Sequence, residues 1–374
     1  MIDIMNWNLE DRTEMYEEEI KALQRSIMQA VNCKRDEVPQ AQEQLKALQE
    51  HLTETIPEDT DAYLVAQVSL EESQGDLYQR MGKIKEASAY YDRMARYAAQ
   101  LLQKDEKDAG AAYRMAVALF KQAGCIRLGI NCQIVTPKPR SLNEQENKAF
   151  QAAVSRYKEA VRLMLPAAKE GKAREMTMTS NCLNDLSTMY GVVGNYKDAL
   201  EASRSAVQID RTLYDHMDDA PHSMRVAVHM NGLALLYNLM QNTEMATDTL
   251  EDAIYALSEH EADSPVEFGM AIGRFQMNLA NCYQRSKTQK TNAEETYLNA
   301  LRNIKAVNDK TDNRFVLDLI SAFQAVGQYY ISQGNRSEGE SYLNNGILLA
   351  EENAKTSEQP IFGQLAEQMR KLVG

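Results

Sequence analysis

The chain of 374 residues repeats itself at a nearly fixed spacing, and this feature limits its fold more than any other. Its tyrosines at 190, 237, 283 and 330 stand 47, 46 and 47 residues apart. The same shift relates three further sets of apolar or small residues, namely Leu186, Leu233, Leu279 and Val326; Ala199, Ala246, Ala293 and Gly339; and Ala206, Ala253, Ala300 and Gly346. A period of about 20–50 residues with helical patterning predicts stacked helix pairs, because one pair is too thin to bury its own apolar face.

Composition supports helices over the other architectures of this size. The chain is 44% hydrophobic and 25% charged, with 17 Gly, 8 Pro and 7% aromatic residues. So few turn-forming residues argue against a β-sandwich, and the hydrophobic content argues against a collagen or a disordered chain. A chain this long also exceeds what a single compact core usually serves.

Each repeat has the same internal order. Residues 186–190 (Leu-Ser-Thr-Met-Tyr) place a large apolar, a small and an aromatic residue on a first helix; a break at Gly194 follows, and Ala199 and Ala206 then fall on a second helix. The pattern resembles the tetratricopeptide repeat, whose first helix carries Leu-Gly/Ala-x-x-Tyr and whose second helix carries Ala. This resemblance implies an all-α fold, a right-handed α-solenoid of tetratricopeptide-like helix pairs with an N-terminal helical hairpin.

The N-terminal segment differs from the rest of the chain. Residues 1–61 hold 15 Asp/Glu against 6 Lys/Arg, yet apolar residues recur at three- and four-residue spacing from Tyr16 to Ala30 and again after Pro39. We therefore predict an acidic helical hairpin over 1–57 that caps a repeat array over 58–356. The array should contain about six helix pairs, with a loop insertion at 124–140, and a C-terminal capping helix should occupy 357–374. Capping boxes at 141–144, 264–267 and 291–294 predict three of the helix starts.

The long period points to members of the repeat family with long helices. The sequence is similar to the long-helix arrays of kinesin light chain. The residues that carry this similarity are Asp219-Ala220-Pro221-His222 and 231–237 (Asn-Gly-Leu-Ala-Leu-Leu-Tyr). The general size and the N-terminal helical segment also resemble bacterial peptide-sensing tetratricopeptide regulators.

In this family the first helices line a concave groove, and the resemblance places a set rich in amides there. Amide side chains donate and accept, so a row of them suits the main chain of an extended peptide, and two arginines suit a carboxylate. The alternative is that these amides hydrogen-bond within their own repeat. The candidate groove residues are Asn181, Asn184, Thr188, Asn231, Asn238, Arg274, Asn281, Gln284, Arg285, Gln324 and Gln328.

Other functions find little support in the sequence. A net charge of −13 without a basic run disfavours nucleic acid and anionic membranes as partners. Five scattered cysteines and a start without a signal-peptide pattern favour a reduced, cytoplasmic protein. Nucleotide-binding, hydrolase and zinc-protease motifs are not found, so we expect no catalytic residue, metal or cofactor.

These observations leave three hypotheses. The first is a non-enzymatic scaffold that holds an extended peptide or protein tail in the groove. The second is a peptide-responsive signalling regulator whose N-terminal hairpin acts on a partner such as a response regulator. The third is an assembly adaptor that uses the convex face. The identity of the partner and the oligomeric state are left open.

Overall fold

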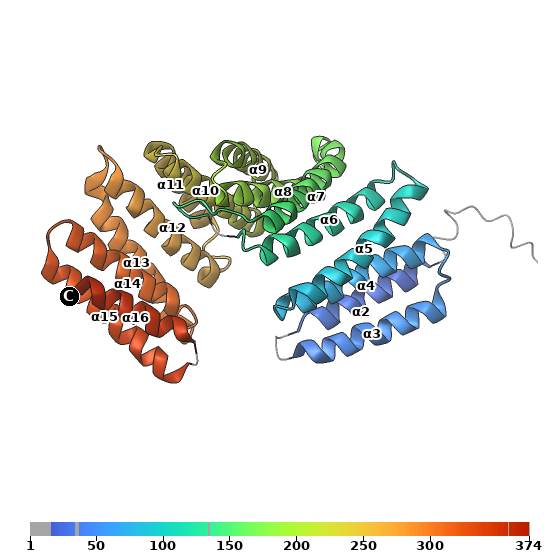
Figure 1. The fold of residues 1–374 in the computed structure, drawn as a ribbon, viewed down its shortest axis with the longest axis horizontal. Coiled ribbons are helices and arrows are strands. Elements are labelled where there is room, and N and C mark those ends of the chain that lie inside the picture. Colours follow the sequence, from blue (N-terminus) through green and yellow to red (C-terminus); the bar gives the residue numbers. More distant parts are fainter. Residues whose placement is uncertain (1–15, 34–36, 134, 358, 374) are drawn as a thin grey trace, which may run out of the picture. The chain divides into compact units, whose positions relative to one another are not determined.

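The computed structural model describes residues 16–33, 37–133, 135–357 and 359–373. Across these ranges the fold consists of α-helices joined by short turns, with one 3-10 turn and no strand (Figure 1). The chain divides into two compact units, Met1–Ala206 and Val207–Gly374, and the division falls within one helix, α9 (Tyr196–Met217). The expected all-α class, with successive helices packed as tetratricopeptide-like pairs and a helical hairpin near the N-terminus, is confirmed.

The first unit contains the hairpin and the first repeats. Apolar residues of the hairpin, including Ile20, Leu23 and Leu45, are buried in a cluster that extends to Leu70 and Leu77 of the first pair. The predicted hairpin segment that precedes Tyr16 lies outside the described residues. In chain order the helices are α2 (Glu17–Val31), α3 (Val38–Thr55), α4 (Asp61–Arg80), α5 (Ile84–Lys104), α6 (Ala109–Gly129), α7 (Glu144–Lys169), α8 (Ala173–Val192) and the first part of α9.

The second unit continues the same alternation of first and second helices. It ends on α16, which buries Phe362, Ala366 and Met369 against the last pair. In chain order its elements are the end of α9, α10 (Ala220–Leu239), α11 (Thr243–Glu259), α12 (Pro265–Arg285), the 3-10 turn η3 (Lys290–Asn292), α13 (Ala293–Lys310), α14 (Val316–Ser332), α15 (Arg336–Thr356) and α16 (Pro360–Val373).

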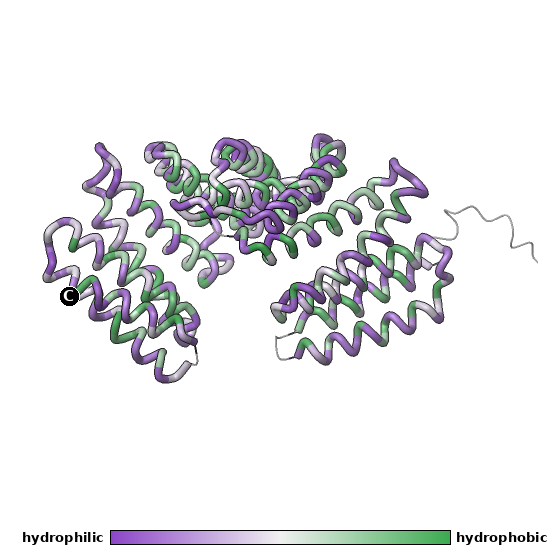
Figure 2. The backbone as a smooth tube through the Cα atoms, in the orientation of Figure 1, coloured by the Kyte–Doolittle hydropathy of each residue, from purple (hydrophilic) through white to green (hydrophobic). Residues whose placement is uncertain are grey.

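The repeated residues form the core within each pair. Ala199, Ala246 and Ala293 are fully buried, as are Ala253 and Ala300, because small side chains let paired helices approach closely. Apolar and polar residues alternate along every helix in Figure 2, so each helix buries one side and exposes the other.

The loop between α6 and α7 begins later than the predicted insertion at 124–140. Residues 124–129 complete α6, because Cys125 is buried in the core and continues the apolar face of the helix. The loop therefore spans 130–143, and the main-chain N–H of Arg140 donates to the carbonyl of Val192 at 2.8 Å. This contact fastens the loop to the end of α8.

Candidate functional site

The first helices of the second unit share an exposed side, which we call the first-helix face. Its residues recur every three or four positions along each helix and every 46–47 positions between helices. They are Val228, Asn231, Leu235 and Asn238 on α10; Arg274, Asn278, Asn281 and Arg285 on α12; and Ser321, Ala325, Gln328 and Ser332 on α14. Each is exposed or half-buried, since the opposite side of each helix packs into the core.

Two aliphatic residues break the polarity of this face. Val228 is 46% exposed and Leu235 is 41% exposed on α10, where they alternate with the two asparagines of that helix. Together they give α10 exposed large apolar side chains on this face, which α12 and α14 lack. Neither residue is among the candidates predicted from the sequence, although their spacing of three and four from Asn231 indicates the same side of the helix.

Several polar groups of the face already bind one another across neighbouring first helices. The Asn278 side-chain N–H donates to Asn231 Oδ1 at 2.8 Å, and the Asn238 amide donates to Cys282 Sγ at 3.0 Å. The Gln284 amide donates to Ser332 Oγ at 2.9 Å. The interpretation that these amides serve the fold therefore holds for part of the set, and these bonds fix the spacing of α10, α12 and α14.

Arg274 is also engaged. Its Nε and Nη2 lie 2.7 and 2.8 Å from the two carboxylate oxygens of Asp318 on α14. The hydrogen bonds that Arg274 donates to the Asp318 carboxylate raise the pKa of Arg274, which stays charged. A carboxylate of a ligand would have to displace Asp318 from this arginine.

A buried tyrosine holds the amides of α12 from behind. Tyr297 of α13 donates its hydroxyl to Asn281 Oδ1 at 2.7 Å and lies 3.0 Å from Gln284 Oε1. Burial raises the pKa of Tyr297 to about 12, so the hydroxyl keeps its proton and remains a donor. The oxygen atoms of both amides are thus fixed toward the core, and their N–H groups are turned outward, where that of Asn281 meets the carbonyl of Met277.

Three of the predicted residues keep their polar groups available. Among the described parts of the chain, no group lies within hydrogen-bond distance of the side chains of Arg285, Gln324 or Gln328. Arg285 and Gln328 are exposed, whereas Gln324 is half-buried at the edge of the face. Arg285 is therefore the cation on this face that is open to a ligand carboxylate.

The remaining predicted residues, Asn181, Asn184 and Thr188, lie half-buried on α8 in the first unit. Thr188 donates to the carbonyl of Asn184 at 3.1 Å, which leaves the two amides as the groups that could meet a ligand. Asp185 lies on the same side of the helix and was not predicted. It accepts the hydroxyl of buried Tyr157 at 2.7 Å.

Charged residues dominate the first helices of this unit. Lys121 of α6 lies 2.7 Å from Asp76 of α4, and Arg127 of α6 lies 3.4 Å from Asp185 of α8. They line a hollow of about 440 Å³. Sequence spacing could not reveal these pairs, because their partners are 45 and 58 residues apart and the second pair departs from the repeat pattern.

Within the described ranges, no three His, Cys, Asp or Glu side chains come together in a way that could hold an ion. In the same ranges, no helix combines the length and the apolar character needed to cross a bilayer.

Comparison with known proteins identifies the fold. No protein-family model matches the sequence, and no curated protein sequence matches it. The structure is similar to that of RapI, with a TM-score of 0.54 and 12% identity over 90% of this chain and 99% of that one. It is also similar to BtubC from P. vanneervenii, with a TM-score of 0.52 and 17% identity over 74% of this chain and 94% of that one. A third similar structure is that of aspartyl phosphate phosphatase F from Bacillus subtilis, with a TM-score of 0.51 and 14% identity over 100% of this chain and 81% of that one.

The chain has the tetratricopeptide-repeat fold. At these identities the likeness concerns the fold alone. In tetratricopeptide terms, α10, α12 and α14 are the first helices of three successive repeats, and the first-helix face is their shared exposed side.

Proposed function

We propose that this tetratricopeptide-repeat chain is a non-enzymatic scaffold that holds an extended peptide or protein tail on the first-helix face. One observation supports the proposal: three successive first helices carry Arg285 and Gln328, for which the described residues provide no hydrogen bond or ion pair, on the same face as exposed Val228 and Leu235. The apolar pair would bind a side chain of the ligand, the amides its main chain, and Arg285 a carboxylate.

The fixed amides also support binding. Because Asn281 and Gln284 are held by Tyr297, and α12 is joined to α14 by Gln284 and Arg274, a ligand would meet groups that are already ordered. Ordered groups lose less conformational entropy on binding than mobile ones, so even a small polar set can hold an extended chain.

The test begins with peptides selected from a random display library against the full chain. We expect the double substitution Arg285→Ala with Gln328→Ala to weaken the best peptide at least tenfold by calorimetry, or about 1.4 kcal/mol. The melting temperature should stay unchanged, because neither side chain has a partner in the fold.

A matched control removes the same two kinds of group, one cation and one amide, from second helices. Lys305→Ala with Asn344→Ala deletes one exposed cation and one exposed amide from α13 and α15. This control should bind the peptide like the unaltered chain. Equal affinity in all three proteins would refute binding at the first-helix face.

A second candidate is a peptide-responsive regulator that acts on a phosphorylated partner. The likeness of fold to RapI and to an aspartyl phosphate phosphatase over most of this chain favours it. The direct measurement is phosphate release from an aspartyl-phosphorylated receiver domain, with and without the selected peptide. A rate that changes with the peptide supports the regulator, and a constant background rate supports the scaffold alone.

A further inference from the structure

In two repeats, an aromatic ring from the second helix covers the repeat tyrosine of the first helix. Tyr78 of α4 stacks on Tyr90 of α5 with ring centroids 5.1 Å apart and planes 21° apart. Tyr330 of α14 stacks on Tyr342 of α15 at 5.5 Å and 1°. In both cases the second tyrosine follows the first by twelve residues. The fold therefore has a defined place for a second ring at this position.

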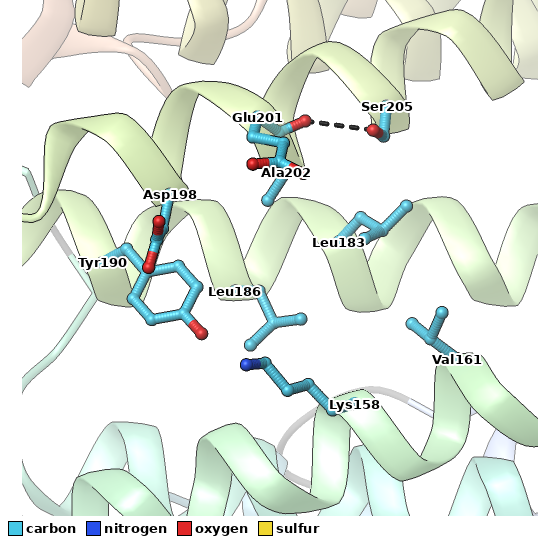
Figure 3. Close-up of a pocket in the computed structure, with 9 residues that line it drawn as sticks. All are labelled: Lys158, Val161, Leu183, Leu186, Tyr190, Asp198, Glu201, Ala202 and Ser205. Atoms are coloured by element: carbon cyan, nitrogen blue, oxygen red, sulfur yellow. Dashed lines mark hydrogen bonds between the residues drawn. The ribbon is translucent and has the colours of Figure 1, made fainter.

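The repeat formed by α8 and α9 has no such ring. The residue twelve positions after Tyr190 is Ala202. A cavity of about 350 Å³ lies beside Tyr190, with an apolar wall from Leu183, Leu186 and Ala202 (Figure 3). This volume falls at the lower end of the range of ligand pockets, about 300–1,000 Å³. In the first repeat a cavity of about 540 Å³ lies at the corresponding place, and Tyr78 and Tyr90 both line it.

The mouth of this cavity carries charges of both signs. In a later repeat, Tyr283 donates its hydroxyl to Glu251 of the preceding second helix at 2.6 Å. Glu251 stands 32 residues before Tyr283, and the residue 32 positions before Tyr190 is Lys158 of α7. The Lys158 ammonium lies 6.0 Å from the centroid of the Tyr190 ring. Figure 3 shows Lys158 and the Tyr190 hydroxyl turned toward the same space, with the Glu201 side chain at the opposite rim on α9.

We propose that this cavity, formed by α7, α8 and α9, is a docking site for one tyrosine side chain of a partner protein. The ring takes the place that Tyr90 and Tyr342 fill in their own repeats, and it packs on the aliphatic wall. The hydroxyl reaches the mouth, where the Lys158 ammonium donates to it and the Glu201 carboxylate accepts from it. Aromatic anchors in small pockets are typical centres of protein interfaces.

The charged residues of the cavity determine which of three aromatic side chains, tyrosine, phenylalanine or phosphotyrosine, it binds best. A phenylalanine fills the same space but leaves Lys158 and Glu201 without a partner. A phosphotyrosine brings negative charge toward Asp198 and Glu201 of α9, and one lysine opposes two carboxylates there. The site thus favours the unmodified phenol.

The probes are N-acetyltyrosinamide, N-acetylphenylalaninamide and N-acetylphosphotyrosinamide, titrated into the full chain and followed by two-dimensional NMR. We expect weak binding of the tyrosine probe, weaker binding of the phenylalanine probe and the weakest binding of the phosphorylated one. Ala202→Tyr should fill the cavity from within, reduce tyrosine-probe affinity at least tenfold and leave the melting temperature undiminished. Lys158→Met should reduce the preference for tyrosine over phenylalanine.

A reciprocal variant keeps the test independent of how Ala202→Tyr folds. Tyr342→Ala removes the covering ring beside Tyr330 and should create a second binding site for the tyrosine probe. Failure of the unaltered chain to bind the probe at millimolar concentration would overturn the proposal. So would unchanged binding by Ala202→Tyr, or absence of new binding in a folded Tyr342→Ala variant. Arg285 and Gln328 are not part of this cavity, so this proposal and that of the first-helix face can fail separately.

Discussion

Asp210 is the most deeply buried charged residue among the described residues of the second unit. Its carboxylate is fully buried and accepts from Arg225 Nε at 2.9 Å and from the ring nitrogen Nδ1 of His229. Burying a carboxylate without such donors is costly, so the three side chains depend on one another. They join the end of α9 to α10.

We expect Asp210→Ala to lower the free energy of unfolding by about 3–5 kcal/mol, because it removes the carboxylate that binds half-buried Arg225 and buried His229. Urea unfolding followed by circular dichroism measures this loss. The control is Asp252→Ala, which breaks an exposed pair with Arg211 at 2.6 Å and should cost less than about 1 kcal/mol. Similar losses in the two variants would contradict the assigned role of Asp210.

At this scale the sequence predicted which residue types recur, but not what each one touches. The resemblance to the tetratricopeptide repeat predicted that Asn231, Asn281 and Gln328 lie on the exposed side of first helices, and all three are exposed or half-buried there. The partner of Arg274 could not be predicted, since Asp318 lies 44 residues away on another repeat and the relative rotation of two helices is not encoded in spacing. The contact between Tyr297 and Asn281 could not be predicted from spacing either, because Tyr297 lies on the second helix of the repeat.

Paired helices approach closely in the last repeat, where both contact positions are glycine. A Cβ added to Gly327 of α14 would lie 2.7 Å from Leu343 Cγ and 2.9 Å from the carbonyl oxygen of Gly339 on α15. Earlier repeats carry Ala234 and Ala280 at the first of these positions. The spacing of α14 and α15 is therefore set by the absence of side chains.

We expect Gly327→Ala to destabilise the chain by about 1–3 kcal/mol, because the main chain of α15 must move away. The comparison is Gly124→Ala in α6, where the nearest atom to the added Cβ is 3.9 Å away. That substitution should stabilise by up to about 1 kcal/mol through helix propensity. Thermal unfolding of both variants measures the difference, and a stabilised Gly327→Ala would show that the helices are not in close contact.

Helix existence was predictable, whereas helix starts were less so. The pattern of apolar residues correctly indicated the paired helices, but the cap of α7 is Asn143 with Glu146, not Ser141 with Glu144. The start of α13 is preceded by the turn η3 and carries no side-chain cap. Several polar residues near a start satisfy the capping pattern, and main-chain geometry selects one of them.

At the scale of the whole molecule, hydroxyl groups of buried tyrosines are a recurring feature of both units. Tyr91 and Tyr157 in the first unit and Tyr297 in the second are fully or almost fully buried and donate to Asp76, Asp185 and Asn281. Burial raises the pKa of all three phenols, to about 12 for Tyr297 and further for the other two. In the unfolded chain the pKa of each phenol is about 10, so each loses its proton at a lower pH than in the folded chain.

A raised pKa in the folded chain contributes stability that is complete below pH 10 and is lost as the pH rises through the folded pKa. We therefore expect the chain to lose stability progressively above about pH 10 and to unfold before these phenols titrate individually. Absorbance at 295 nm and circular dichroism, recorded together, measure ionisation and unfolding. A late group of tyrosines should ionise with the loss of helix. Smooth ionisation of every tyrosine near pH 10 with the helices intact would contradict this expectation.

The fold class was the part most open to prediction, because the period of 46–47 residues and the burial pattern within each repeat are both properties of sequence alone. The exposed side of the repeats was only partly predictable, because ion pairs such as Lys121 with Asp76 depend on which helices become neighbours. The cavity beside Tyr190 illustrates the limit, since Lys158, Leu186 and Ala202 come together in it only when three helices have packed.

The bonds between successive first helices have a consequence for how such a chain can change over generations. Asn278 binds Asn231 at a separation of 47 residues, and Arg274 and Gln284 bind Asp318 and Ser332 at 44 and 48. These bonds are not the same from repeat to repeat, because the equivalent of Asn278 on α14 is Ala325. A genetic deletion of one whole repeat would keep the helical spacing but set Asn231 against a side chain that neither donates nor accepts. Gain or loss of a helix pair therefore requires a compensating substitution at the new junction.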